Sequence, residues 1–167
     1  MLGTVFLFLY WPSFNAALAT GMASHRAAVN TLFSISASVL SSCYVSRLYC
    51  GKIDMEVMLN SSLAGGVVMG AACDIIVGPG FCMIAGAIAG AISAIGFLKF
   101  NPMSKERLAI HDTCGVHFLH GIPGFLGAIV CIIAIAAGHY NFENVTQLDI
   151  IFPANKTDRT VQQQAQI

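Results

Sequence analysis

The stretch HDTCGVHFLHGIPG, residues 111–124, combines three histidines and an aspartate with the start of a long apolar run. A neutral imidazole both donates and accepts a hydrogen bond, so it can hold a small polar solute or pass a proton where little water is present. His117 and His120 are three residues apart, which predicts that they are neighbours on one helical face, with His120 further into the span. One interpretation is a histidine that lines a pore, and the other is a structural hydrogen bond between helices.

Asp112, in the same stretch, stands where the cap of a helix start is expected. Its carboxylate can accept hydrogen bonds from free backbone N–H groups and is favourably placed against the helix dipole. A metal site would need a third and a fourth ligand, and the sequence offers only Cys114 at a matching spacing. We therefore expect no metal and no other cofactor. Without a nucleophile and base pair, a phosphate loop or a cofactor fingerprint, we do not expect an enzyme.

The composition of the chain is typical of a membrane protein. Of its 167 residues, 56% are hydrophobic and 10% are charged, and the mean hydropathy is +0.74. The net charge is zero without a run of Lys or Arg, which argues against nucleic acid as a partner. The six cysteines lie mostly in apolar segments and show no CxxC spacing, so the sequence predicts no disulfide framework.

Five segments are long and apolar enough to cross a bilayer as helices, which takes about 20 residues each. The predicted fold class is therefore all-α, a polytopic transmembrane helix bundle within residues 1–138. The polar tail, residues 139–167, is predicted to be an extracellular loop. The five segments cover residues 2–19, 28–49, 59–78, 81–100 and 113–137.

Basic residues predict the orientation of the bundle. They follow the second and the fourth segment, whereas the other two connections carry only Arg26. By the positive-inside rule the two basic loops are cytoplasmic, so the first and fifth segments run outward. The tail is then outside, where Asn144 and Asn155 begin sequons and are candidate glycosylation sites. The basic residues of the two loops are Arg47, Lys52, Lys99, Lys105 and Arg107.

Small residues and one acid stand out within the apolar segments. Asp74 lies in the run GAACDIIVGPG, where it could line a transport path, reach the membrane surface or bond a neighbouring helix. The spacing of small residues predicts close approach of helix backbones in the third and fourth segments. These residues are Gly66 and Gly70 in the third segment, and Gly86, Gly90 and Ala94 in the fourth.

Five motifs, in order along the chain, resemble the Rh glycoproteins of the ammonium transporter (Amt/Mep/Rh) superfamily: FLYWPSFNAAL, HRAAVNT, GKIDM, NSSLAGGVVMG and HDTCGVHFLHGIPG. The resemblance implies trimers of subunits with about eleven or twelve helices, built as inverted repeats. Each subunit would contain its own hydrophobic pore for ammonia or ammonium, with carbon dioxide as a second proposed substrate. It also implies a multi-pass protein of the plasma membrane that forms homo- or hetero-trimers with Rh subunits.

The resemblance assigns roles to individual residues. His120 matches the second histidine of the family's pore pair, and Phe14 matches a phenylalanine that gates the outer mouth. Asp112 matches an acid assigned to pore support or to a proton path, and we group His117 with it. Leu18 stands where Amt members carry a serine that recruits ammonium, which favours the Rh branch. Beside Phe14 in the same motif, Trp11 and Asn15 are expected to serve packing and orientation.

The chain departs from the family pattern in two ways. It holds only about five of the family's helices, so we expect an internal fragment that lacks the partner histidine and a last helix and is inactive alone. At residue 118 many Rh members carry asparagine, whereas this chain has Phe118. A lumen-facing Phe118 would narrow the pore, and one that faces a neighbouring helix would have no such effect.

Two other classes of function stay open. A non-transporting, structural Rh-like subunit would be expected to lose the pore histidine, yet His120 is present. An ion-coupled transporter of an unrelated family would use Asp74 and Asp112 as cation ligands. The five collinear motifs favour the Rh interpretation over both.

Overall fold

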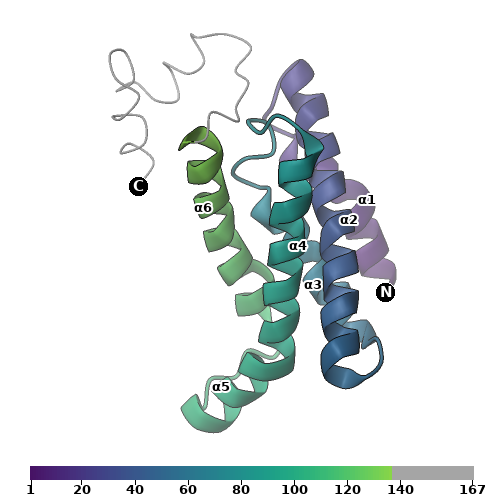
Figure 1. The fold of residues 1–167 in the computed structure, drawn as a ribbon, viewed down its shortest axis with the longest axis vertical. Helices are drawn as coiled ribbons and strands as arrows, with labels where there is room; N and C mark the ends of the chain where they lie inside the picture. Colours follow the sequence, from purple (N-terminus) through teal and green to yellow (C-terminus); the bar gives the residue numbers. More distant parts are fainter. Residues whose placement is uncertain (137–167) are drawn as a thin grey trace.

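A computed structural model describes residues 1–136, and every regular element in that range is helical. The predicted all-α fold class is confirmed. In Figure 1, α2, α4 and α6 lie side by side along the long axis, with α1 and α3 further from the viewer. The predicted loop at 139–167, with Asn144 and Asn155, lies outside the described residues. The elements are α1 (Leu2–Asn15), α2 (Met22–Cys50), α3 (Met55–Val68), α4 (Pro79–Ile95), the π-helical turn η1 (Gly96–Phe100), α5 (Asn101–Leu108), the π-helical turn η2 (His117–Gly121) and α6 (Ile122–Ala136).

Each of the five predicted segments contains a helix, but the helices differ in length. Within the described residues, three helical runs are long and apolar enough to cross a membrane: Met22–Cys50, Pro79–Leu108 and His117–Ala136. Helices α1 and α3 have 14 residues each, which is shorter than the about 20 residues of a full crossing.

The third segment was expected to be helical over residues 59–78, and this is wrong at both ends. Helix α3 begins earlier, at Met55, because the carboxylate of Asp54 accepts hydrogen bonds from the backbone N–H groups of Glu56 and Val57. It ends at Val68, and turns follow.

Two side chains of α2 support these turns. Nδ2 of Asn30 donates to the carbonyl oxygens of Cys73 and Ile76, both at 2.9 Å, and Nε of Arg26 donates to that of Asp74 at 2.7 Å. Cys73 and Ile76 are buried. These carbonyls thus have protein donors although they lie outside a helix, which stabilises the buried non-helical backbone.

The fourth predicted connection, residues 101–112, is mostly helix rather than loop. Helix α4 continues through η1 into α5, which reaches Leu108 because NPMSKERL is rich in helix-forming residues and places its proline in the first turn. Ala109 then takes a left-handed conformation with φ 52° and ends the helix. The fifth helical run starts at His117, four residues later than expected.

Helix α2 is the centre of the packing and contacts α1, α3 and α4. Its inward face carries a buried polar residue at every fourth position: Asn30, Ser34, Ser38, Ser42 and Ser46. Two of these bind α3 directly, since Oγ of Ser34 donates to the Gly65 carbonyl at 2.7 Å and Oγ of Ser38 donates to the Ser61 carbonyl at 2.8 Å. We call this row the polar face of α2.

The predicted small-residue contacts hold for α4 and fail at Gly70. No room exists for a Cβ on Gly86 or Gly90, because Ser34 and Ser38 of α2 lie against them. Gly70 is exposed in the turns after α3, where a Cβ would meet only the nearby Val67 carbonyl. The small residues therefore bring α4 onto the polar face of α2.

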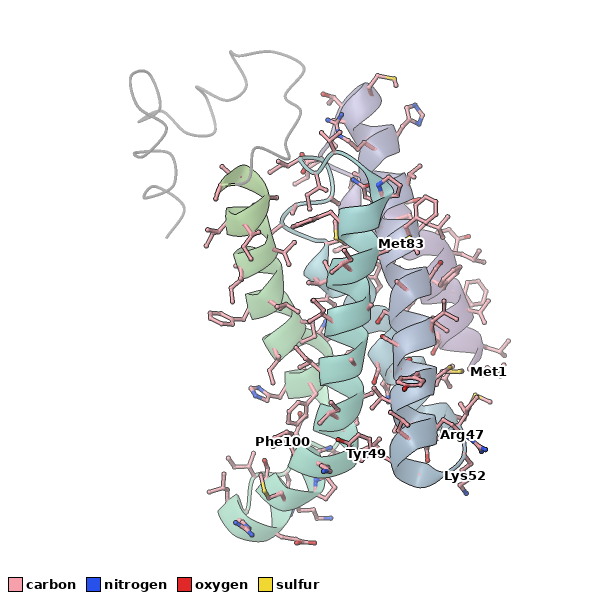
Figure 2. The ribbon with its side chains drawn as sticks, viewed as in Figure 1. Met1, Arg47, Tyr49, Lys52, Met83 and Phe100 are labelled. Atoms are coloured by element: carbon pink, nitrogen blue, oxygen red, sulfur yellow. The ribbon has the colours of Figure 1, made fainter. Side chains whose placement is uncertain are left out.

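The basic loops meet at one end of the bundle. Figure 2 shows Arg47, Tyr49, Lys52 and Phe100 at that end. Nζ of Lys99, at the end of η1, lies 4.7 Å from the ring centroid of Tyr49, near the end of α2. This contact agrees with the expectation that the two basic loops lie at the same end of the bundle.

Candidate functional site

Three rings from two distant parts of the chain form a row. The indole of Trp11 stacks on the imidazole of His120 with 6.2 Å between centroids and 16° between ring planes. The ring of Trp11 also contacts that of Phe14, with 6.1 Å between centroids and 57° between ring planes. Phe14 is 75% exposed and His120 is also exposed. The two residues expected to line a pore, His120 and Phe14, thus each contact the same ring, that of Trp11. We call these three residues the aromatic row.

The backbone of α3 supports the middle of the aromatic row. A Cβ on Gly66 would lie 2.5 Å from both Cδ1 and Nε1 of Trp11, so the indole lies against a surface that only glycine provides. Nδ2 of Asn15 donates to the Gly66 carbonyl at 3.0 Å and to Oγ1 of Thr31 at 3.1 Å. These bonds join the end of α1 to α2 and α3, in agreement with the orienting roles expected of Trp11 and Asn15.

The contact between Trp11 and His120 is a feature of the candidate site that sequence reasoning missed. The two residues are separated by most of the chain, and no spacing rule relates them. The motif WPSFN drew attention to Phe14, yet it is the indole that touches the imidazole. The only signal in the sequence was the presence of a tryptophan one helical turn before the expected gate residue.

Asp112 bonds to the start of the helical run, but it does not occupy the predicted N-cap position, which belongs to Val116, four residues later. Its Oδ1 accepts a hydrogen bond from the backbone N–H of Val116 at 3.0 Å, and its Oδ2 accepts one from that of His117 at 2.9 Å. Nδ2 of Asn101 donates to the Asp112 backbone carbonyl at 3.3 Å, which ties the cap to α5. Both carboxylate oxygens therefore hold the backbone at the start of the helical run.

His117 and His120 do not share a helical face, so that prediction is wrong. Residues 117–121 form a π turn in which the N–H of Ile122 bonds to the carbonyl of His117, five residues earlier. This turn contains one residue more than an α-helical turn, which moves residues three apart to different sides. His117 lines a cleft beside α4 and α5, whereas His120 faces α1.

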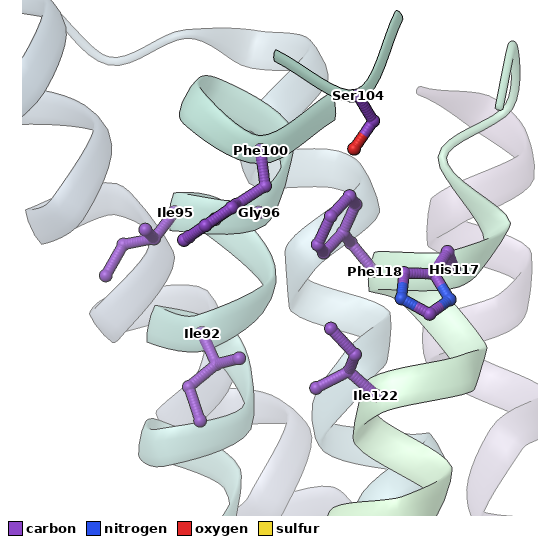
Figure 3. A pocket seen from close by; sticks show the side chains of 8 residues that line it. All are labelled: Ile92, Ile95, Gly96, Phe100, Ser104, His117, Phe118 and Ile122. Carbon is purple, nitrogen blue, oxygen red and sulfur yellow. The ribbon is translucent and has the colours of Figure 1, made fainter. Parts of the chain in front are cut away.

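Phe118 faces a neighbouring helix. It is 7% exposed, and its ring leaves no room for a Cβ on Gly96. The ring centroids of Phe97 and Phe100 each lie 6.4 Å from that of Phe118. Figure 3 shows Phe118 pointing from η2 toward η1, at the wall of a cleft of about 420 Å³. Phe118 therefore meets the second of the two expectations for this residue, that it faces a neighbouring helix.

The two acids of the ion-coupled alternative are far apart. Asp74 lies between α3 and α4, and Asp112 lies between α5 and α6. These two connections are at opposite ends of the bundle in Figure 1. A single cation site built from both carboxylates is therefore excluded.

The sequence matches the family model described as Ammonium Transporter Family over residues 1–167. The chain is 50% identical over 133 residues to ammonium transporter Rh type C of Oryctolagus cuniculus, covering 78% of this chain and 28% of that protein. It is 43% identical over 166 residues to Rh type C of Canis lupus familiaris, covering 96% of this chain and 36% of that protein. The chain thus spans about a third of the length of these curated relatives.

Two solved structures superpose on this chain. The Rh50 protein of Nitrosomonas europaea superposes with a TM-score of 0.75 and 36% identity, covering 90% of this chain and 38% of the other. A sensor Amt protein superposes with a TM-score of 0.71 and 20% identity, covering 99% of this chain and 37% of the other, which supports the fold alone. With its apolar helical runs, the chain is a multi-pass membrane protein. It belongs to the ammonium transporter family.

Proposed function

We propose that this chain supplies one wall of an Rh-type ammonia pore within a protein as long as its relatives. The observation that carries the proposal is the aromatic row, where the exposed rings of Phe14 and His120 both contact Trp11. The names of the relatives, ammonium transporters of Rh type, support ammonium or ammonia as the substrate. The activity is conduction rather than catalysis.

The side chains of the aromatic row suit the passage of neutral ammonia better than that of ammonium. A bare cation is costly in a narrow apolar lumen, so ammonium loses its water and gives its proton to outside water near the outer gate formed by Phe14. Ammonia then passes His120, whose imidazole offers a hydrogen bond that hydrocarbon cannot. We assign His117 and Asp112 to support of this helix, with a proton path through them as the alternative role.

The wider assignments are proposals of the same kind. We propose a homo- or hetero-trimer with Rh subunits in the plasma membrane, with the end that carries Arg47 and Lys99 in the cytoplasm. Asn144 and Asn155 would then be outside and glycosylated. The chain by itself, without the remaining helices, is expected to conduct nothing. Carbon dioxide as a second substrate stays a prediction.

The structural-subunit alternative has less support. A subunit that only anchors its partners has no use for an exposed imidazole stacked on a tryptophan. The geometry of Trp11 and His120 therefore favours transport.

The test is a flux assay on the full-length protein that contains this chain, reconstituted in lipid vesicles with a pH-sensitive dye inside. An ammonium gradient should alkalinise the lumen faster than in empty vesicles, and His120→Ala should change this rate while trimer assembly is unaffected. His111→Ala is the matched control, because the His111 ring bonds only to the nearby Ala109 carbonyl in the described structure. A His120→Ala rate equal to that of the unmodified protein would remove His120 from the pore. A carbon dioxide gradient in the same vesicles tests the second substrate.

A further inference from the structure

Two π turns lie opposite each other near the basic end of the bundle. In η1 the N–H of Asn101 bonds to the carbonyl of Gly96, and in η2 the N–H of Ile122 bonds to that of His117. Phe118 of η2 sits on Gly96 of η1 (Figure 3). Single π turns inside α-helices occur often at functional sites. Here the two turns contact each other through one ring.

The helical run that contains η2 is fixed at two places. At its start, Asp112 bonds to the backbone N–H groups of Val116 and His117. Further along, Gly127 of α6 lies against α3, where a Cβ would be 2.7 Å from the carbonyl oxygen of Val68. One residue of an α-helix corresponds to about 100° of rotation. The additional residue of η2 therefore decides which way the side chains between the two anchors face.

We propose that Phe118 is a positioning residue that sets the orientation of His120. The ring fills the space beside Gly96. This contact keeps residues 117–121 in a π turn, which has one residue more than an α-helical turn. With the π turn in this place, His120 stacks on Trp11. If the turn relaxed to α-helix or moved, His120 would rotate by about 100° and leave Trp11. The proposal concerns the histidine of the proposed pore, but the orientation itself can be measured without any transport.

Trp11 makes that orientation measurable, because it is the single tryptophan of the chain and stacks on His120. A protonated imidazole in contact with an indole quenches its fluorescence. We define the acid quench as the fraction of Trp11 emission lost between about pH 8 and about pH 5. The measurement uses the full 167-residue chain in lipid nanodiscs, with circular dichroism to monitor its helix content. His120→Gln should abolish the acid quench. His117→Gln should keep it, because the ring of His117 lines the cleft and not Trp11.

The decisive variants change the contact between the two π turns and leave Trp11 and His120 in place. Phe118→Ala and Gly96→Ala should both lose the acid quench, down to the level of His120→Gln. Phe118→Leu, which keeps an apolar side chain on Gly96, should restore most of it. Phe100→Ala is the matched control, because it removes a ring that contacts Phe118 but does not lie on Gly96. It should keep the quench.

Retention of the full acid quench in a helical Phe118→Ala chain overturns the proposal. Equal loss in Phe100→Ala and Phe118→Ala also overturns it, because the effect would then be a general loosening of the cleft. If Phe118→Ala fails to fold, Gly96→Ala replaces it, and retention of the full acid quench in Gly96→Ala overturns the proposal. The proposed function fails separately: absence of ammonia flux in the unmodified full-length protein would leave the fluorescence result unchanged.

Discussion

The indole of Trp11 rests on Gly66, where a Cβ would come within 2.5 Å of both Cδ1 and Nε1 of the ring. This contact joins α1 to α3 and holds the ring that stacks on His120. The position of Trp11, the partner of the His120 ring, thus depends on the absence of a Cβ at Gly66 in α3.

Gly66→Ala should displace the Trp11 ring and destabilise the fold by about 1–3 kcal/mol, the usual cost of overpacking a tight contact. Thermal unfolding in detergent measures the loss, and the emission maximum of Trp11 reports the displacement. Gly3→Ala is the matched control, because nothing lies within 4 Å of a Cβ at that position. Equal melting temperatures for the two variants would show that the contact at Gly66 is not tight.

Asn30→Ala should loosen the turns between α3 and α4. The substitution leaves the carbonyls of Cys73 and Ile76 without their donor, at a cost of about 1–3 kcal/mol. Hydrogen exchange of residues 69–76 should become faster. Ser36→Ala serves as the control, since Ser36 bonds only within its own helix, to the Leu32 carbonyl, in the described structure. Unchanged exchange in Asn30→Ala would mean that other groups hold these turns.

Asp112→Ala should lose the cap of the last helical run, at a cost of about 0.5–2 kcal/mol. The amides of Val116 and His117 should exchange faster, because they lose their acceptor. Asp112→Ser keeps one acceptor oxygen without the charge, so it should retain part of the protection. If the serine variant keeps this protection yet loses ammonia flux in the full-length protein, the charge of Asp112 has a role in conduction beyond capping.

Gly86→Ala should push α4 away from α2, because the Ser34 backbone occupies the place of the new methyl group. We expect a loss of about 1–3 kcal/mol, measured as a lower unfolding temperature in detergent. Gly80→Ala, in the first turn of the same helix, meets nothing within 4 Å and is the matched control. A stable Gly86→Ala would contradict a tight crossing of α2 and α4 at this point.

The sequence was a good guide where one physical effect dominates. Apolar length alone locates the helical runs of α2, α4 and α6. The bonding of Asp112 to a helix start follows from its place in the sequence, although its distance from that start does not, and the contacts of Gly86 and Gly90 follow from spacing. The aromatic row joins two residues that the Rh resemblance selected, His120 and Phe14.

The remaining features depend on groups that are distant in sequence. The apolar run after Val68 looks helical, and its turns are stable only because Asn30, about 40 residues earlier, supplies donors to its carbonyls. The π turn at residues 117–121 leaves no trace in a hydrophobic pattern, because one additional residue in an apolar helix changes no residue type. For this reason the faces of His117 and His120 were mispredicted.

The polar face of α2 has a consequence for how the protein is made. During synthesis α2 emerges before α3 and α4, so Asn30, Ser34 and Ser38 enter the membrane before their acceptors exist. Their hydroxyl and amide groups must then bond to the helix's own carbonyls or remain near water. Helix α2 is therefore expected to wait beside the translocation machinery and to move into lipid together with the helices that follow it.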